Sequence, residues 1–286
     1  MRFRTEIEPL RSDLRFDHNR PVVMLGSCFT DNIGARLAAD GFDVTANPFG
    51  ALYNPMSIAV PLLRVLDRRP HTAADLTPGP RGFHCLDYST AFSSDKAEEV
   101  ITKANNSLET LQRTIEKPGA TLIATFGTAY IFSFANDGRP VGNCHKFPAS
   151  CFIRRRLGID EITECWQRLA TRLRAESGVD RILLTISPIR HLADGLHGNT
   201  ISKATLHLAV DALAGCCDYF PAFEIMNDDL RDYRFYAADM KHPSETAVDY
   251  IYERFSEAYF DRNTLAEAMA CRARSRHEAH RPILEP

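Results

Sequence analysis

A serine that directly follows a short apolar run is the first residue of this sequence that could act as a nucleophile. Residues 21–25, Pro-Val-Val-Met-Leu, predict a buried strand that ends at Gly26, and Ser27 comes next. Apolar residues at helical spacing over 31–39 predict a helix immediately afterwards. Such a junction suits a nucleophile, because helix N–H groups stabilise a developing oxyanion. Serine is also a favoured helix cap, so a purely structural role for Ser27 stays open at this point.

An aspartate and a histidine near the other end of the chain could activate this serine. Asp239 and His242 lie in the run Asp-Met-Lys-His-Pro, ahead of a helix predicted over 244–259. The spacing lets the carboxylate accept a hydrogen bond from one ring nitrogen while the other nitrogen faces a hydroxyl. Together with Ser27, the pair predicts a Ser-His-Asp triad for acyl transfer.

Cys28 is the competing nucleophile. A thiolate is intrinsically more nucleophilic than a hydroxyl, and a helix N-terminus would lower the pKa of Cys28. At a sharp turn, however, neighbouring side chains point in different directions, and Ser27 is the residue that follows the glycine directly. We therefore assign the nucleophile to Ser27.

Apolar runs alternate with segments of helical period along the whole chain, which predicts a layered α/β fold. Further buried strands are expected over 42–45, 121–126, 181–187 and 219–225. Further helices are expected over 54–66, 96–115, 159–173 and 200–214. No repeat or linker divides the chain, so we expect one domain over 1–286, with 262–286 as a peripheral C-terminal tail.

Two segments interrupt this alternation. Residues 67–94 are rich in Pro, Gly, Ser and Thr, which predicts a long surface loop that could serve as a lid. Residues 130–134 and 139–144 flank Asn-Asp-Gly at 136–138, a strong signal for a β-hairpin inserted into the α/β fold. The consecutive arginines at 154–156 are expected in a solvated turn.

The composition argues against several classes of function. The 286 residues are 44% hydrophobic and 25% charged, and the formal net charge of -3 gives no indication of nucleic-acid binding. No run approaches the ~20 apolar residues that cross a bilayer, and the first residues lack the apolar run of a signal peptide. The eight cysteines form no Cys-x-x-Cys pair, and Cys144 with His145 has no partner pair for zinc. We expect reduced thiols, a cytoplasmic location, and no metal or organic cofactor.

The candidate site segments resemble a known group of enzymes. Gly26-Ser27 and Asp239-x-x-His242-Pro243 are similar to the first and last blocks of SGNH/GDSL hydrolases. The run 26–30, Gly-Ser-Cys-Phe-Thr, resembles more specifically the motif that names the GSCFA-domain family, with Thr30 in place of its final Ala. The resemblance spans roughly residues 20–255 and includes the segments 47–50, 126–129, 143–146, 187–191 and 232–236.

The resemblance implies a fold and an oxyanion hole. The fold would be a flavodoxin-like three-layer α/β/α sandwich with a mainly parallel sheet. In such hydrolases the oxyanion is bound by the N–H of the nucleophilic serine, a glycine N–H and an asparagine side chain. Gly50 matches the glycine, whereas Ala129 stands at the asparagine position. Because loss of one such donor typically costs about 10²–10³ in turnover, another residue should supply it.

Several polar residues could fill this place or bind the substrate. Asn143, across the predicted hairpin from Gly127, is our preferred donor, and Thr128 is nearer but offers only a hydroxyl. His145 and His191 could bind substrate, although a structural role is the alternative for each. The same ambiguity applies to Asn199, Ser202 and Lys203, which are also suitable helix-start residues.

The sequence therefore predicts a serine esterase or acyl hydrolase. By resemblance alone, the substrate would be a small or carbohydrate-linked ester. One alternative is an O-acyltransferase on the same scaffold, with 67–94 as the lid. The other is a catalytically silent binding module that has kept the fold.

Overall fold

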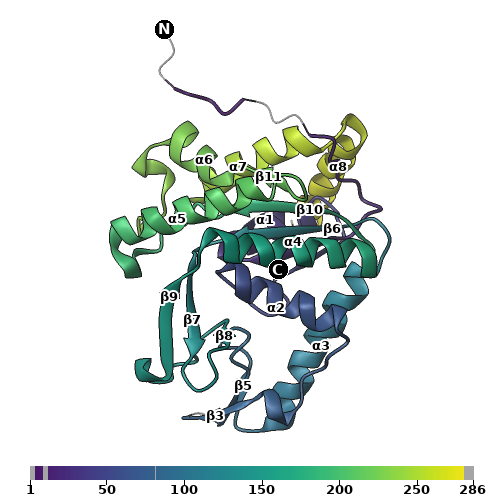
Figure 1. The fold of residues 1–286 in the computed structure, drawn as a ribbon. Coiled ribbons are helices and arrows are strands. Elements are labelled where there is room, and N and C mark those ends of the chain that lie inside the picture. Colours follow the sequence, from purple (N-terminus) through teal and green to yellow (C-terminus); the bar gives the residue numbers. More distant parts are fainter. Residues whose placement is uncertain (1–3, 9–11, 81, 280–286) are drawn as a thin grey trace, which may run out of the picture.

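A five-stranded parallel sheet forms the centre of the computed structural model, which describes residues 4–8, 12–80 and 82–279 (Figure 1). Its strands are β1 (Val22–Gly26), β2 (Val44–Ala46), β6 (Ala120–Phe126), β10 (Val179–Ile186) and β11 (Asp218–Phe220). They lie in the order β11-β10-β6-β1-β2, and all neighbouring pairs are parallel. This is the flavodoxin-like strand order, in which the direction of strand addition reverses between β1 and β6.

The side chains of β1 explain why a continuous apolar run was the right signal for this strand. Val23 and Leu25 point into one hydrophobic core, and Val22 and Met24 point into the other. Successive side chains of a strand alternate between the two faces of its sheet. Because both faces are covered, every residue of β1 is buried.

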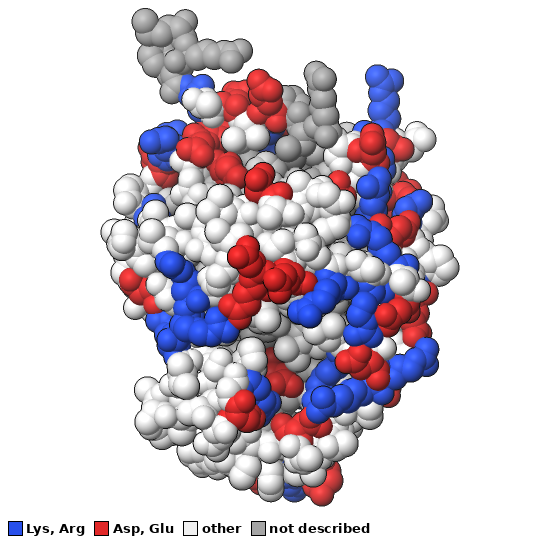
Figure 2. Space-filling view, in the orientation of Figure 1, with Lys and Arg blue, Asp and Glu red and all other residues white. Residues whose placement is uncertain are grey.

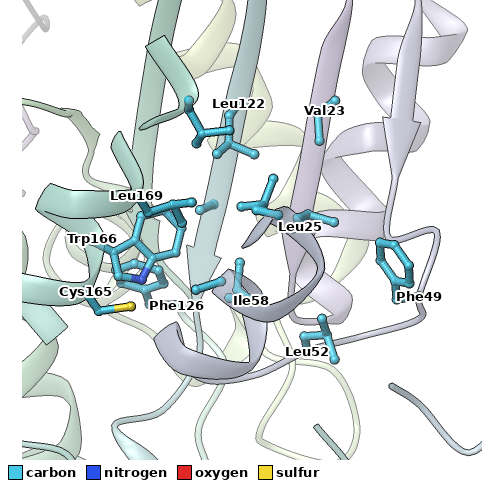
Figure 3. Close-up of a cluster of buried hydrophobic side chains, with 14 of the residues drawn as sticks. Val23, Leu25, Phe49, Leu52, Ile58, Leu122, Phe126, Cys165, Trp166 and Leu169 are labelled. Carbon is cyan, nitrogen blue, oxygen red and sulfur yellow. The ribbon is translucent and has the colours of Figure 1, made fainter. Parts of the chain in front are cut away.

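Helices cover both faces and complete a three-layer α/β/α arrangement. One core contains side chains of α2 (Pro55–Leu66), α3 (Ala97–Ile115), α4 (Ile159–Glu176) and α5 (Gly195–Ala212). The other contains side chains of α1 (Cys28–Ala39) and α7 (Glu245–Tyr259). Figure 3 shows part of the first core, where the Trp166 ring packs edge-on against Phe126 with centroids 4.8 Å apart. The predicted layered α/β fold is confirmed.

The predicted boundaries differ from the structure mainly where polar residues cap or interrupt an element. Helix α1 begins at Cys28, three residues earlier than expected, because Ser27 is its N-cap. The last strand was expected to reach Ile225, but β11 ends at Phe220. Pro221 follows directly and has no N–H to continue a ladder, and the chain turns into short helical segments.

The segment 67–94 is not the surface loop that the sequence predicted. It forms a small antiparallel sheet of β3 (Thr77–Gly79), β4 (Gly82–His84) and β5 (Ser93–Ser94). Its buried residues include His71, Cys85 and Tyr88, and the Tyr88 ring packs 4.4 Å from that of Phe49. Composition was misleading here, because the polar residues of this segment are interspersed with a buried apolar set.

A second small antiparallel sheet is formed by strands that come later in the sequence. Strand β7 (Tyr130–Phe134) pairs antiparallel with β8 (Pro140–Val141) and also with β9 (Phe152–Arg156). The three arginines that were expected in a solvated turn therefore belong to a strand. Arg154 is held there by the aromatic rings of Tyr130 and Phe132, at 4.8 Å and 5.1 Å from their centroids.

The segment expected as a peripheral tail forms α8 (Arg262–Ala279), and residues 280–286 lie outside the described part. Arg272 pairs with Asp40, whose side chain is only 1% exposed, and Ala268 is fully buried. This part of the tail is thus anchored to the end of α1. In the described ranges, no helix combines the length and the apolar character needed to cross a membrane.

Candidate active site

The carboxyl ends of three neighbouring strands meet at one edge of the sheet. Ser27 follows β1, Gly127 follows β6, and Ser187 follows β10. The register pairs Gly26 with Thr125, so the residues that follow these two strands are close in space. Open α/β sheets bind ligands outside the carboxyl ends of their strands, where the strand order reverses. In this sheet that point lies between β1 and β6.

Ser27 has the structural role that the sequence left open, and its role as a nucleophile stays a prediction. Its Oγ accepts a hydrogen bond from the Phe29 N–H at 3.4 Å as the N-cap of α1, and donates to Ser187 Oγ at 3.1 Å. Both serines are fully buried. The hydroxyl at this strand–helix turn is therefore covered in this conformation, and Ser187 lies against it. A substrate carbonyl can reach Ser27 only after a local movement.

Asn47 fixes the backbone on both sides of Ser27. Its Oδ1 accepts the Gly26 N–H at 2.9 Å, and its Nδ2 donates to the Ser27 carbonyl at 3.3 Å and to Asp31 Oδ1 at 2.8 Å. Gly26 itself has φ +153, and a Cβ there would lie 2.5 Å from the Thr125 carbonyl oxygen. Asn47 was expected only as part of the family-like segment 47–50, and its role in fixing this turn was not predicted.

Asp239 and His242 form the pair that their spacing predicts. Asp239 Oδ2 lies 2.5 Å from His242 Nδ1, and its Oδ1 accepts the backbone N–H groups of Lys241 and His242 at 2.9 Å and 3.0 Å. Met240, between them, has φ +57, which makes this turn tight. The His242 backbone N–H and ring, followed by the Lys241 N–H, hold the pKa of Asp239 well below its usual range. Asp239 is therefore an ionised acceptor for the imidazole.

The Asp-His turn lies at the same edge of the sheet as Ser27, although no hydrogen bond joins His242 to Ser27 within the described residues. The N–H of Arg190, in the loop after β10, donates to the Lys241 carbonyl at 3.2 Å. Burial raises the pKa of the Cys28 thiol, and the Asp239 carboxylate adds to this effect. The lowered thiol pKa that a helix N-terminus would give is thus not present, which weakens Cys28 as the nucleophile.

One predicted oxyanion donor, the Gly50 N–H, is occupied, whereas the other residue, Asn143, is held through its side-chain oxygen and its backbone N–H. The Gly50 N–H donates to the Asn47 carbonyl at 2.8 Å. Asn143 Oδ1 accepts the His145 N–H at 2.8 Å, and its backbone N–H donates to Leu86. Within the described residues, no hydrogen bond joins Gly50 or Asn143 to Ser27.

Thr128 and His145 have hydrogen-bond partners within the protein, which gives each of them a structural role. Thr128 Oγ1 shares a hydrogen bond with Ser202 Oγ at 3.1 Å. The ring nitrogens of His145, which is 4% exposed, contact Ser93 Oγ at 2.7 Å and the Tyr88 carbonyl at 3.0 Å. The structural alternative therefore describes His145 better than substrate binding does.

Lys203 makes hydrogen bonds to the residues that follow two of the strands at the site. Its Nζ donates to the carbonyls of Gly127 at 2.7 Å and Ser187 at 2.6 Å. Burial lowers the pKa of Lys203 to about 7. The sequence offered a signal for this position, because Lys203 shares the apolar face of α5 with the buried Leu206 and Val210 at spacings of three and seven.

His191 is the histidine that the structure brings to the site. Its backbone N–H donates to Asn199 Oδ1 at 2.9 Å, and its ring lies edge-on to Tyr53 with centroids 5.8 Å apart. A Cβ at Gly127 would come within 3.0 Å of His191 Nε2. Burial, helped by the charge of Lys203, lowers the pKa of His191 to about 4. The ring is therefore neutral at physiological pH.

One group of side chains has the residue types of a metal site. Ligand atoms of His71, Cys85 and Asp87 all lie within 4.8 Å of one another, and all three residues are buried. However, Asp87 already pairs with Arg64 at 3.6 Å and with Arg139 at 3.1 Å. Two guanidinium groups on one carboxylate oppose the binding of a cation, so we assign the group to the ion-pair network between the segment 67–94 and the hairpin.

Neither the cavity beside the segment 67–94 nor the charge pattern of the face shown in Figure 2 indicates a partner for this site. A cavity of about 870 Å³ lies among Arg64, Asp75, Arg139 and Phe147, and none of its lining residues belongs to the predicted site. Figure 2 shows acidic and basic side chains interspersed over one face of the molecule, without the continuous basic surface that nucleic acid requires.

Comparison with models of protein families gives a match. The model of the GSCFA family matches residues 21–255, from the start of β1 to α7, and so includes Ser27, Asp239 and His242. Among curated proteins, no match was found.

Proposed function

We propose that this chain, which belongs to the GSCFA family, is a serine hydrolase that cleaves a small or carbohydrate-linked ester through Ser27, His242 and Asp239. One observation carries the proposal. The 2.5 Å contact between Asp239 and His242 is made in a turn that also binds the loop after β10, where the Arg190 N–H donates to the Lys241 carbonyl at 3.2 Å. The flavodoxin-like strand order and the Gly-Ser turn at β1 support the further proposal that the fold is that of SGNH/GDSL hydrolases.

The arrangement assigns a step to each of the three side chains. With Nδ1–H donated to the ionised Asp239, the Nε2 lone pair of His242 is free to act as a base. Ser27 Oγ turns away from Ser187, gives its proton to His242 and attacks the ester carbonyl. His242 then protonates the leaving alcohol, and a water molecule, activated in the same way, releases the acid from Ser27.

The backbone at the start of α1 would stabilise the negative charge of the intermediate. N–H groups at a helix N-terminus favour an anion, and Asn47 fixes the turn that carries them. Gly50 and Asn143 remain proposed donors to the same oxygen. Gly50 would first have to give up its contact with the Asn47 carbonyl, whereas the side-chain nitrogen of Asn143 could donate while its Oδ1 keeps the His145 N–H.

The test combines covalent labelling with turnover. We expect a fluorophosphonate probe to label Ser27, and aryl acetates or acetylated sugars to be hydrolysed. Ser27→Ala should abolish labelling and lower kcat by about 10³–10⁶. Cys28→Ser is the matched control at the neighbouring position and should keep most of the activity. Unchanged turnover in Ser27→Ala refutes the mechanism, and a wild-type protein that neither labels nor turns over is a binding module.

The complete burial of Ser27 favours one second candidate, an O-acyltransferase. A site that excludes water protects the acyl-enzyme from hydrolysis until an acceptor alcohol arrives. An isotope-labelled acyl donor with a sugar acceptor separates the two reactions. Label in the sugar ester indicates transfer, whereas label only in the free acid indicates hydrolysis.

A further inference from the structure

The geometry points to His191 as an additional catalytic residue, whose Nε2–H donates a hydrogen bond to the carbonyl oxygen of the substrate as negative charge develops on it. This inference rests on the proposed function and names a contact within the same site.

The unsatisfied atom is His191 Nε2. It is buried, and within the described part of the chain it has no hydrogen-bond partner. Buried polar atoms in native proteins almost always have a partner, so an exception requires an explanation such as a bound molecule. His145 shows the contrast, because each of its ring nitrogens contacts an oxygen within 3.0 Å.

The position of this nitrogen suits contact with a substrate at Ser27. His191 lies four residues beyond Ser187, whose Oγ contacts Ser27 Oγ at 3.1 Å. Its Nε2 is 3.0 Å from the place that a Cβ of Gly127 would occupy, at the carboxyl end of β6. Strand β6 is the neighbour of β1, so the nitrogen lies beside the point where the strand order reverses.

The imidazole is held in place by other segments of the chain. Asn199, in α5, accepts the His191 backbone N–H at 2.9 Å. Tyr53 presents its ring at 78° to the imidazole, and its carbonyl accepts the Gly127 N–H at 2.8 Å. A donor fixed before the reaction costs little reorganisation when charge develops, which is the property that an oxyanion contact requires.

The protonation state also fits the role. Burial is the main cause that lowers the pKa of His191 to about 4, and Lys203, His242 and Arg154 act in the same direction, against Asp194. A neutral imidazole carries one N–H, and it can donate this hydrogen to an oxyanion without losing it. A charged imidazolium would instead be a competing acid beside His242.

The experiment measures ester hydrolysis by three variants, with p-nitrophenyl acetate as the substrate. His191→Ala should lower kcat by about 10²–10³ and change KM little, because the contact strengthens in the transition state. His191→Gln, whose amide can donate from a similar position, should recover at least about tenfold of that loss. His197→Ala removes an exposed histidine from the same region and should behave like the wild type.

The outcomes separate this inference from the proposed function. If Ser27→Ala keeps its activity, the proposed function fails. If Ser27→Ala is inactive but His191→Ala matches His197→Ala, or only raises KM, His191 is not the donor. Should His191→Ala misfold, the wild type labelled with ¹⁵N-histidine provides a second readout. Phosphonylation of Ser27 should shift the His191 Nε2–H resonance downfield, and an unchanged resonance overturns the assignment.

Discussion

Replacing Lys203 by methionine should change the stability of this protein in a way that depends on pH. The ammonium of Lys203 is buried, and burial lowers its pKa from the ordinary 10.5 to about 7. Between these two values the unfolded chain binds a proton that the folded chain does not. Stability contributed by Lys203 therefore rises with pH through this window and is lost as the pH falls towards 7.

The magnitude follows from this shift. Each pKa unit corresponds to about 1.4 kcal/mol, so full titration of Lys203 changes the stability by about 5 kcal/mol. Between about pH 6.5 and about pH 9, the part that can be measured is about 2–3 kcal/mol. The two carbonyl contacts, to Gly127 and Ser187, favour the charged form and reduce this value. Methionine has no titrating group, so the difference between wild type and variant isolates the effect.

Urea unfolding followed by tryptophan fluorescence provides the assay. Trp166 is the single tryptophan and is fully buried against Phe126, so its emission reports global unfolding. The stability of the wild type relative to Lys203→Met should increase from about pH 6.5 to about pH 9. Lys103→Met removes an exposed ammonium that also donates to a carbonyl. The stability of the wild type relative to Lys103→Met should stay constant over the same pH range. A constant or decreasing difference for Lys203→Met would refute the reasoning.

Two other substitutions test the site directly. Asp239→Asn should lower kcat of ester hydrolysis by about 10³–10⁴, because the amide favours the wrong tautomer of His242, and steady-state kinetics that show an unchanged kcat would contradict the triad. Gly127→Ala should destabilise the fold by about 1–3 kcal/mol in urea titration, since its Cβ would meet His191 Nε2 and the Tyr53 carbonyl at 3.0 Å. Equal stability of the Gly127→Ala protein would show that these groups can move aside.

The central sheet was predictable because its strands are buried on both faces. Runs such as 121–126 are mainly apolar, and a strand covered on both faces leaves this signal regardless of its partners. Helix starts were predictable where a cap is local, as at Asn54, whose side chain accepts the Ser57 N–H. In both cases the information lies within a few residues of sequence.

The segments that were mispredicted depend on contacts across the chain. Residues 67–94 fold inwards partly because Arg64 pairs with both Asp75 and Asp87, and Arg139 from the hairpin pairs with Asp87 as well. Strand β9 pairs with β7, and Arg154 packs on aromatic rings of that strand. Charge and turn composition suggest solvent exposure when such partners are unknown.

In the candidate site, too, the local contacts could be predicted from the sequence and the long-range contacts could not. The contact between Asp239 and His242 spans three residues, so spacing alone predicted it. The contact of Ser27 with Ser187 spans 160 residues and depends on the order of β1, β6 and β10, which no local pattern contains. The orphan nitrogen of His191 likewise becomes visible only when its surroundings are assembled.

The contact between the two buried serines has a consequence for the resting protein. A reactive hydroxyl on the surface would be open to any activated acyl compound in its surroundings. Here the hydroxyl is covered and donates a hydrogen bond to Ser187. An agent that cannot displace this neighbour therefore leaves Ser27 unmodified. Selectivity would then begin before the chemical step, with the ability of a ligand to open the site.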